Sequence, residues 1–299
     1  MPGKTNGGVL DLRVLRYFIA VAEEGNITWA AELLRISQPT LSRQMRAMEQ
    51  ALGVTLFHRG AHEITLTDEG RMLLERARTM VALADKTERD LHESNGALSG
   101  TITLGCGESR SLPRLFERMR DFRAAHPQVV FDVFTLTADV SKDQLDQGLL
   151  DLAVLVEPVA VERYDYLRLP ERDVWGVTVR ADDPLAQGDR TAVTPADMVG
   201  RDLIVPARPE VRREVMTWLG RAARQARVAG TCNLTLNGTK MVRAGLGVRI
   251  GFNVGEGAPD VRFLPLDPPI ETQTLLAWRK GRSLAPAAQS FVDFLRSGE

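Results

Sequence analysis

The stretch from Ser37 to Arg46, SQPTLSRQMR, carries side chains that can read duplex DNA. An arginine binds guanine bidentately and a glutamine binds adenine in the same way, each at a base edge in the major groove. Serine and threonine hydroxyls, and the free backbone amides at a helix start, suit phosphate oxygens. Because one short stretch provides all of these groups, it predicts a DNA-reading surface.

A helix from Gln38 to about Leu52 is expected to position these side chains. Its apolar residues recur at helical spacing and form one buried face, made of Leu41, Met45, Met48 and Leu52. The opposite face presents Pro39, Arg43, Arg46 and Gln50, flanked by Thr40 and Ser42. Ser37 is the predicted N-cap, and a proline in the first turn is tolerated.

Two shorter helices precede this one. The first covers residues 10–24 and ends at Gly25, and the second covers 29–34 with Thr28 as its predicted cap. A short helix, a tight turn and a helix with a polar outer face form the helix-turn-helix pattern. Spacing alone leaves a second interpretation equally open, in which the polar face is simply the solvated side of a three-helix bundle.

Two β-like runs, residues 54–59 and 63–67, surround a short turn and predict a hairpin wing beside the third helix. Arg59 on the first run is a candidate contact to the DNA backbone. The wing favours the DNA-binding interpretation.

Residues 68–93 predict a long helix, with Thr67 as its cap and two acidic residues in its first turn. Its apolar seam keeps alternating four-and-three spacing through Leu73, Ala77, Met80, Ala84, Thr87 and Leu91. A lone amphipathic helix of this length needs a partner for its seam, which predicts a dimer. The alternative is that the seam packs on its own domain.

After a small-residue hinge at 94–100, strands and helices alternate as in a parallel sheet. Two such α/β units, joined at 157–162 and again at 264–269, predict two lobes with a ligand crevice beyond the strand ends. The expected fold class is α/β with an N-terminal all-α winged helix-turn-helix, a long linker helix and a two-lobed effector domain similar to periplasmic binding proteins. The expected bounds are 10–67 for the winged domain, 68–93 for the linker helix, 94–100 for the hinge, 101–160 and 267–299 for lobe I, and 161–266 for lobe II.

Composition limits the function classes. The chain has 299 residues, 26% of them charged, and a formal net charge of −1, so any DNA contact must be a local patch. The two cysteines, Cys106 and Cys232, lie outside any CxxC motif, which argues against a zinc site and a disulfide scaffold. No signal-like segment and no long apolar run is present, so we expect a cytoplasmic protein with no membrane partner, no metal and no cofactor.

The order of elements and the residues themselves resemble LysR-type transcriptional regulators. The N-terminal part follows the family pattern almost position by position, in LRYFIAVAEEGNITWAAELLRISQPTLSRQMRAMEQALGVTLFHR and LTDEG. Looser matches continue through GTITLG, AHP, GLLDLAVL, DDPLA and MVRAGLGV. The resemblance implies a helix-turn-helix motif at 27–46, a dimer of dimers, a small-molecule effector between the lobes, and RNA polymerase as a further partner.

The pattern and the resemblance together give the expected DNA contacts. These are Thr28, Ser37, Gln38, Pro39, Thr40, Ser42, Arg43, Arg46, Arg59 and Thr67. The chain departs from the family pattern at Trp29, where many members have a basic residue, and at the weakly basic wing tip over 60–63. The three arginines of the set are therefore expected to supply more of the phosphate attraction.

The expected effector contacts come from positions that line the cleft in relatives. These are Cys106, Gly107, Glu108, Ser109, Thr135, Thr137, Pro206, Asn237 and Gly247. Free amides at a helix start favour an anionic ligand, whereas Glu108 favours a cationic or neutral polar one. Two positions have a second interpretation: Asn237 as a helix cap, and Cys106 as an inert thiol.

A ligand-responsive transcription factor is the favoured function. An enzyme on the α/β lobes is not expected, because the sequence has no recognisable catalytic nucleophile with its general base and no metal-binding set. A cytosolic solute-binding or sensor protein that responds through a cysteine redox switch is the alternative.

Overall fold

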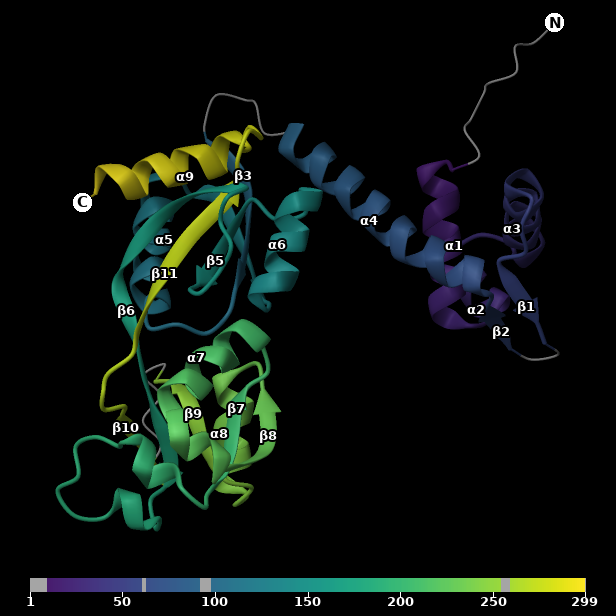
Figure 1. Cartoon of the computed structure of the whole chain (residues 1–299). Helices are drawn as coiled ribbons and strands as arrows, with labels where there is room; N and C mark the ends of the chain where they lie inside the picture. The colour runs from purple at the N-terminus through teal and green to yellow at the C-terminus, as the bar shows by residue number, and fades with distance from the viewer. Residues whose placement is uncertain (1–9, 61–62, 92–97, 254–258, 299) are drawn as a thin grey trace, which may run out of the picture. The chain divides into compact units, whose positions relative to one another are not determined.

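The computed structural model describes residues 10–60, 63–91, 98–253 and 259–298. The internal contacts divide the chain into two compact units, Met1–His92 and Glu93–Glu299. Figure 1 shows short helices, a small hairpin and a long helix in the first unit, and a two-lobed α/β arrangement in the second.

Three helices build the centre of the N-terminal unit: α1 (Leu12–Glu24), α2 (Ile27–Leu33) and α3 (Gln38–Leu52). The predicted apolar face of α3 is confirmed, since Leu41, Met45 and Met48 are buried and Leu52 packs against the same core. Glycines end α1 and α3 in the left-handed backbone region, at φ 60° and 70° respectively.

The prediction that Thr28 caps α2 is wrong. The cap is Asn26, whose side-chain oxygen accepts hydrogen bonds from the backbone N–H of Thr28 at 2.8 Å and of Trp29 at 3.3 Å. Asparagine is at least as good a cap as threonine, so the helix begins earlier than expected. Ser37 does hold the N-cap position of α3, but its hydroxyl bonds the Thr40 hydroxyl at 2.7 Å instead of a backbone amide.

The predicted wing is an antiparallel hairpin of β1 (Phe57–Arg59) and β2 (Ile64–Leu66). Glu49 of α3 positions its start, because the carboxylate accepts hydrogen bonds from the backbone N–H of Leu56 at 2.8 Å and of Phe57 at 3.3 Å. The wing-tip residues Ala61 and His62, and the Arg59 side chain, lie outside the described part.

Thr67 directly precedes helix α4 (Asp68–Leu91), and its hydroxyl accepts a hydrogen bond from the backbone N–H of Gly70 at 2.9 Å. The first half of its seam packs on its own unit, since Leu73 and Ala77 are buried in the three-helix core and Met80 lies against it. The alternative interpretation therefore applies to this half. Further along, Leu83 is 40% exposed and Leu91 is 72% exposed.

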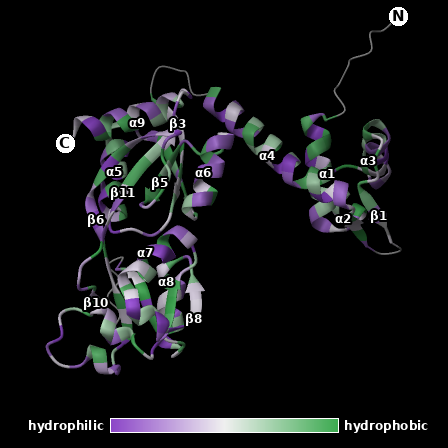
Figure 2. Cartoon of the chain, viewed as in Figure 1, coloured by the Kyte–Doolittle hydropathy of each residue, from purple (hydrophilic) through white to green (hydrophobic). Residues whose placement is uncertain are grey.

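Lobe I of the C-terminal unit has, among the described residues, four strands of its own and part of a fifth strand that it shares with lobe II, with helices on both faces of the sheet (Figure 1). Its elements are β3 (Ser99–Cys106), α5 (Leu112–Ala125), β4 (Gln128–Thr135), α6 (Ala138–Gln147), β5 (Leu152–Val156), β11 (Glu271–Arg279) and α9 (Pro286–Ser297). Strands β4, β3 and β5 are parallel, and β11 is antiparallel to β5. Leu152 and Val154 face the α5 and α9 side, whereas Ala153 and Leu155 face the α6 side, as strand alternation requires. Figure 2 shows hydrophobic residues concentrated along β3 and β5.

Lobe II is built around its own core on a second group of strands. Its elements are β7 (Asp202–Pro206), α7 (Pro209–Leu219), β8 (Arg227–Cys232), α8 (Thr235–Arg243), β9 (Val248–Phe252) and β10 (Val261–Pro265), with 3-10 turns at Pro184–Ala186, Pro195–Met198 and Gly220–Arg224. Strands β8, β7 and β9 are parallel, so their carboxyl ends meet at one edge of the sheet.

One long strand, β6 (Tyr164–Arg180), belongs to both lobes. Its residues 164–174 pair with β11 of lobe I, and its residues 175–180 pair with β9 and β10 of lobe II. The expected start of lobe II at residue 161 therefore differs from the structure, in which the chain crosses between lobes near Trp175. The turn at 157–162 was the expected crossing because a continuous strand shows no break in its sequence pattern.

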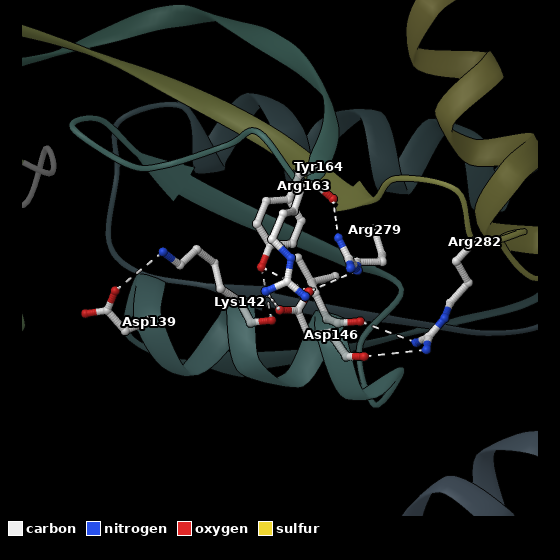
Figure 3. Close-up of polar contacts among 8 residues, drawn as sticks. Asp139, Lys142, Asp146, Arg163, Tyr164, Arg279 and Arg282 are labelled. Atoms are coloured by element: carbon white, nitrogen blue, oxygen red, sulfur yellow. Dashed lines mark hydrogen bonds and ion pairs between the residues drawn. The ribbon is translucent and has the colours of Figure 1, made fainter.

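A polar network fixes α6 against the start of β6 and the end of β11 (Figure 3). The Asp146 carboxylate accepts a hydrogen bond from the Tyr164 hydroxyl at 3.2 Å and pairs with Arg163 and Arg279, each at 3.1 Å. Burial and the Asp146 carboxylate raise the pKa of Tyr164 to about 12. Arg282 donates to the carbonyl oxygens of the last turn, where a helix carries negative partial charge. Because α6 is held at its C-terminal end, its N-terminus has a defined place in lobe I.

Candidate nucleic-acid interface and effector cavity

The outward face of α3 is polar over its first three turns. Gln38, Pro39, Arg43 and Arg46 are exposed, and Thr40 and Ser42 are half-buried. The Arg43 guanidinium bends back over the helix start, where it donates to the Pro39 carbonyl oxygen at 3.3 Å and to the Thr40 hydroxyl at 3.5 Å. These contacts are weak, so the guanidinium is available to another acceptor.

A hollow of about 350 Å³ lies between α2, α3 and the wing. Predicted DNA contacts on its wall are Thr28, Gln38, Ser42 and Arg46. Asn26, Gly60 and Glu63 also line it and were not among the predicted contacts. An asparagine directly before a helix is a recognised cap signal, so Asn26 could have been found. Because α2, α3 and the wing share this surface, the structure brings the polar residues of all three elements together.

Thr67 does not offer a hydroxyl to DNA as predicted. The residue is buried, and its hydroxyl donates to the Thr55 carbonyl oxygen at 2.8 Å while it accepts from the amide of Gly70. Both hydrogen-bonding functions of the hydroxyl are therefore used inside the unit. Thr67 joins the end of the wing to the start of α4.

A second cavity, of about 140 Å³, lies between the two lobes of the C-terminal unit. Lobe I contributes residues 107–108, 136–138, 154 and 156–157. Lobe II contributes residues 206–208, 211, 232–235 and 249–252, and Trp175 lies at the crossing. The wall is mostly apolar, with a few charged side chains, which is typical of small-molecule sites.

Four of the predicted effector contacts line this cavity: Gly107, Glu108, Thr137 and Pro206. Glu108 also links the two lobes. Its carboxylate accepts hydrogen bonds from the backbone N–H of Thr235, at short range, and of Leu236 at 3.3 Å. These are free amides at the start of α8, so the Glu108 charge is satisfied by a helix N-terminus.

Ser109 does not line the cavity, because it belongs to a buried network behind it. Its hydroxyl donates to the Asp173 carboxylate at 2.7 Å, and the amide of Arg110 donates to the same carboxylate at 2.8 Å. The Thr274 hydroxyl completes the network at 2.8 Å from Asp173. At this helix start, where an external anion was expected, the amide of Arg110 therefore already binds an internal carboxylate, and the amide of Ser111 donates to the Ser109 hydroxyl at 3.1 Å.

The other four predicted contacts also lie elsewhere. Cys106 is buried in the lobe I core, and Thr135 is exposed at the end of the edge strand β4. Asn237 is exposed inside α8 and is not its cap, because that helix begins at Thr235. Gly247 has φ 156°, and a Cβ there would overlap the Asp202 carbonyl oxygen, so its role is close packing of backbone.

Two arginines of the cavity wall, Arg208 and Arg249, were missed. Arg249 is 4% exposed, and the hydrogen bonds that the structure describes for it go to neutral oxygens: Phe252 O at 2.6 Å and the hydroxyls of Thr178 and Thr235 at 3.4 Å. Burial lowers the pKa of the Arg249 guanidinium from its ordinary value. Arg249 could have been found from the sequence, because a charged residue within the apolar strand VRIGF is unusual.

Both cysteines are free thiols. Burial raises the pKa of the Cys106 thiol and of the Cys232 thiol, which lines the cavity. A raised pKa lowers the thiolate fraction, and the thiolate is the reactive form. This argues against the redox-switch alternative.

No cluster of three or more potential metal-binding side chains occurs among the residues that the structure describes. Within the same residues, no helix is both long and apolar enough to cross a membrane.

The winged three-helix unit and the two-lobed ligand domain define a class of transcriptional regulator, and the chain belongs to the LysR family of that class. Residues 12–71 match the model of the bacterial regulatory helix-turn-helix protein, lysR family, and residues 95–298 match the LysR substrate binding domain. The chain is thus a LysR-type transcriptional regulator with a DNA-binding and a substrate-binding domain.

Individual relatives resemble the chain over nearly its whole length. The Hca operon transcriptional activator HcaR of Escherichia coli (strain K12) is 29% identical over 296 residues, covering 95% of this chain and 96% of HcaR. The SDS degradation transcriptional activation protein of Pseudomonas sp. (strain ATCC 19151) is 31% identical over 300 residues, covering 94% of each. The crystal structure of CbnR, a LysR family regulator, superposes with a TM-score of 0.78 at 23% identity, covering 96% of this chain and 99% of CbnR. A structure of full-length CbnR with its target DNA matches with the same TM-score and identity, covering 97% of this chain.

Proposed function

We propose that the protein binds one DNA sequence through the outer face of α3 and that a small molecule in the cavity between the lobes controls this binding. The observation that carries the proposal is the division of α3 into a buried apolar face and an exposed polar face. Such a helix fits the major groove while its apolar side holds it to the bundle. Because the target is chromosomal DNA, the proposal also implies action in the cytoplasm.

The proposed base readers are Gln38, Arg43 and Arg46, which are exposed on one side of α3. Ser37, Thr40 and Ser42 are proposed to contact phosphates, together with Thr28 at the start of α2. Arg59 is proposed as a backbone contact from the wing. Thr28, Ser42 and Arg46 line the same hollow, which supports a single contact surface for both groups.

We further propose a dimer that forms through the C-terminal half of α4. The support is that Thr87 of the seam and Leu83 beside the seam are exposed there, in contrast to the buried first half of the seam. Two recognition helices would then read half-sites about one helical turn apart.

Pairing of two dimers into a tetramer and contact with RNA polymerase complete the proposal. In this scheme the ligand acts by changing lobe closure or dimer packing, and so half-site spacing.

The test is titration of the full chain against the duplex upstream of its own gene and against a scrambled duplex. The Arg43→Ala variant should lose about 1–3 kcal/mol of binding free energy on the upstream duplex and should discriminate less between the upstream and the scrambled duplex. Arg59→Ala should weaken binding to both duplexes equally and reduce the salt dependence. Arg221→Ala, at an exposed arginine of the C-terminal unit, is the matched control. Equal affinity of the unmodified protein for both duplexes would contradict the proposed function.

A further inference from the structure

The cavity between the lobes contains a buried cation that the described residues do not neutralise by direct pairing. The Nε atom of Arg249 is buried and has no hydrogen-bond partner among the residues that the structure describes. Its remaining hydrogen bonds go to a carbonyl oxygen and two hydroxyls, none of which carries a charge. A buried charge is costly unless it is paired, so an unpaired one at a cavity wall points to a charged ligand.

The surroundings of Arg249 are shaped to accept its side chain. A Cβ on Gly238, within α8, would overlap Arg249 Cδ, and a Cβ on Gly251, within β9, would overlap its Nη1. Glycine destabilises the interior of a helix or strand, so two glycines around one side chain indicate that the position of the guanidinium matters. Lobe II therefore provides a defined space for the Arg249 side chain.

The backbone adds to the positive potential. Three helices begin at the cavity wall, as shown by its lining residues Thr137 at α6, Arg208 at α7 and Thr235 at α8. A helix N-terminus carries partial positive charge. Arg208 is a second cation on the wall, and its Nε lies 3.7 Å from Asp139 and 3.6 Å from Glu210.

Two carboxylates of the wall oppose this potential, Glu108 and Glu157. Glu108 is bound to the first amides of α8, so its charge serves the contact between the lobes. From the sequence, Glu108 favoured a cationic or neutral ligand, whereas free amides at a helix start favoured an anionic one. Because the Glu108 carboxylate is already bound by the amides of α8, it does not call for a cationic ligand. The remaining volume is enclosed mainly by apolar side chains, among them Trp175, Ile250 and Phe252.

We propose that the cavity binds a small organic acid with a compact apolar body, and that Arg249 binds its carboxylate. This inference rests on the proposed function, because it names the chemical class of the controlling ligand. The carboxylate supplies acceptors for the unpartnered Nε, and the apolar body packs against the aromatic and aliphatic wall.

The test uses three probes of nearly equal shape and different charge: cyclohexanecarboxylate, cyclohexanecarboxamide and cyclohexylmethylamine. Binding to the full chain is measured by calorimetry and by the shift in unfolding temperature. The carboxylate should bind about tenfold more tightly than the amide, because a charge-assisted hydrogen bond is stronger than a neutral one, and the amine should bind most weakly. Equal binding of carboxylate and amide, or absence of carboxylate binding at millimolar concentration, would overturn the proposal.

The Arg249→Met variant separates ligand binding from structural support. It should lose the preference for the carboxylate, and its unfolding temperature without ligand should stay equal or rise, because an unpaired buried charge is removed. A variant that unfolds at a clearly lower temperature, or that keeps the preference for the carboxylate, would overturn the assignment of Arg249. Arg213→Met, at an exposed arginine of α7, is the matched control and should bind all three probes as the unmodified protein does.

The outcome is independent of the DNA experiment. Carboxylate binding that depends on Arg249, in a protein without sequence-specific DNA binding, would leave this inference standing and remove the proposed function. Specific DNA binding without a preference for the carboxylate would have the reverse meaning.

Discussion

The recognition surface and the effector cavity are built in different ways. The predicted contacts on α2 and α3 lie between Thr28 and Arg46, and one helical period places most of them. The cavity wall draws on residues between Gly107 and Phe252, brought together by strand pairing in two lobes. The comparison teaches that a site within one helix can be derived from spacing, whereas a site at several strand ends depends on topology.

The largest expected effect tests whether the recognition surface depends on the buried face of α3. Met45 is 1% exposed in the N-terminal core, so Met45→Ala should lower the free energy of unfolding by about 2–5 kcal/mol. Hydrogen exchange of the full chain should show faster exchange in α1 to α3. Gln50→Ala, at an exposed position on the same helix, should change the exchange little. Unchanged hydrogen exchange in the Met45 variant would contradict the view that the buried face of α3 holds its polar face in place.

A somewhat smaller effect is expected at the network behind the cavity. Asp173 is fully buried and accepts hydrogen bonds from Ser109, Thr274 and the amide of Arg110. Asp173→Asn removes the charge that these donors satisfy and should cost about 1–3 kcal/mol of stability, measured by denaturant unfolding.

The same variant sharpens the comparison, because the network holds the loop that carries Glu108. If the cavity depends on long-range contacts, Asp173→Asn should also weaken the binding of cyclohexanecarboxylate, although Asp173 does not line the cavity. Asp165→Asn, at an exposed position of the same strand, is the control. Loss of stability in both variants alike would show that the effect is not specific to the network.

The smallest expected effect concerns the anchor of α6. The folded-state pKa of Tyr164 is about 12, above its ordinary value of 10.0, so the protonated hydroxyl is favoured in the folded protein. Its stabilising contribution should therefore be complete below pH 10 and be lost as the pH rises toward 12.

Phenolate absorbance during alkaline titration measures this directly, since the chain has three tyrosines. Tyr164→Phe should abolish the latest-titrating phenolate, whereas Tyr166→Phe should retain it. A late phenolate that survives in the Tyr164 variant would contradict the assigned hydrogen bond to Asp146.

The sequence by itself determined the elements and the face of α3 that points outward, because helical period, caps and glycine stops are local. It placed Leu41, Met45 and Met48 inside and Arg43 and Arg46 outside, as the structure has them. It misplaced the α2 cap by two residues, because Asn26 and Thr28 are both capable caps and only the backbone geometry selects one.

Only the tertiary structure decided which side chains meet between the lobes. Five predicted contacts lie near strand ends, a helix start or turns, yet they face the core, a buried network, solvent or a neighbouring backbone: Cys106, Ser109, Thr135, Asn237 and Gly247. Arg249 lies inside a strand and reaches the cavity because two glycines leave space for it. Strand register, a shared strand and close backbone approach set these directions, and each depends on residues far apart in the chain.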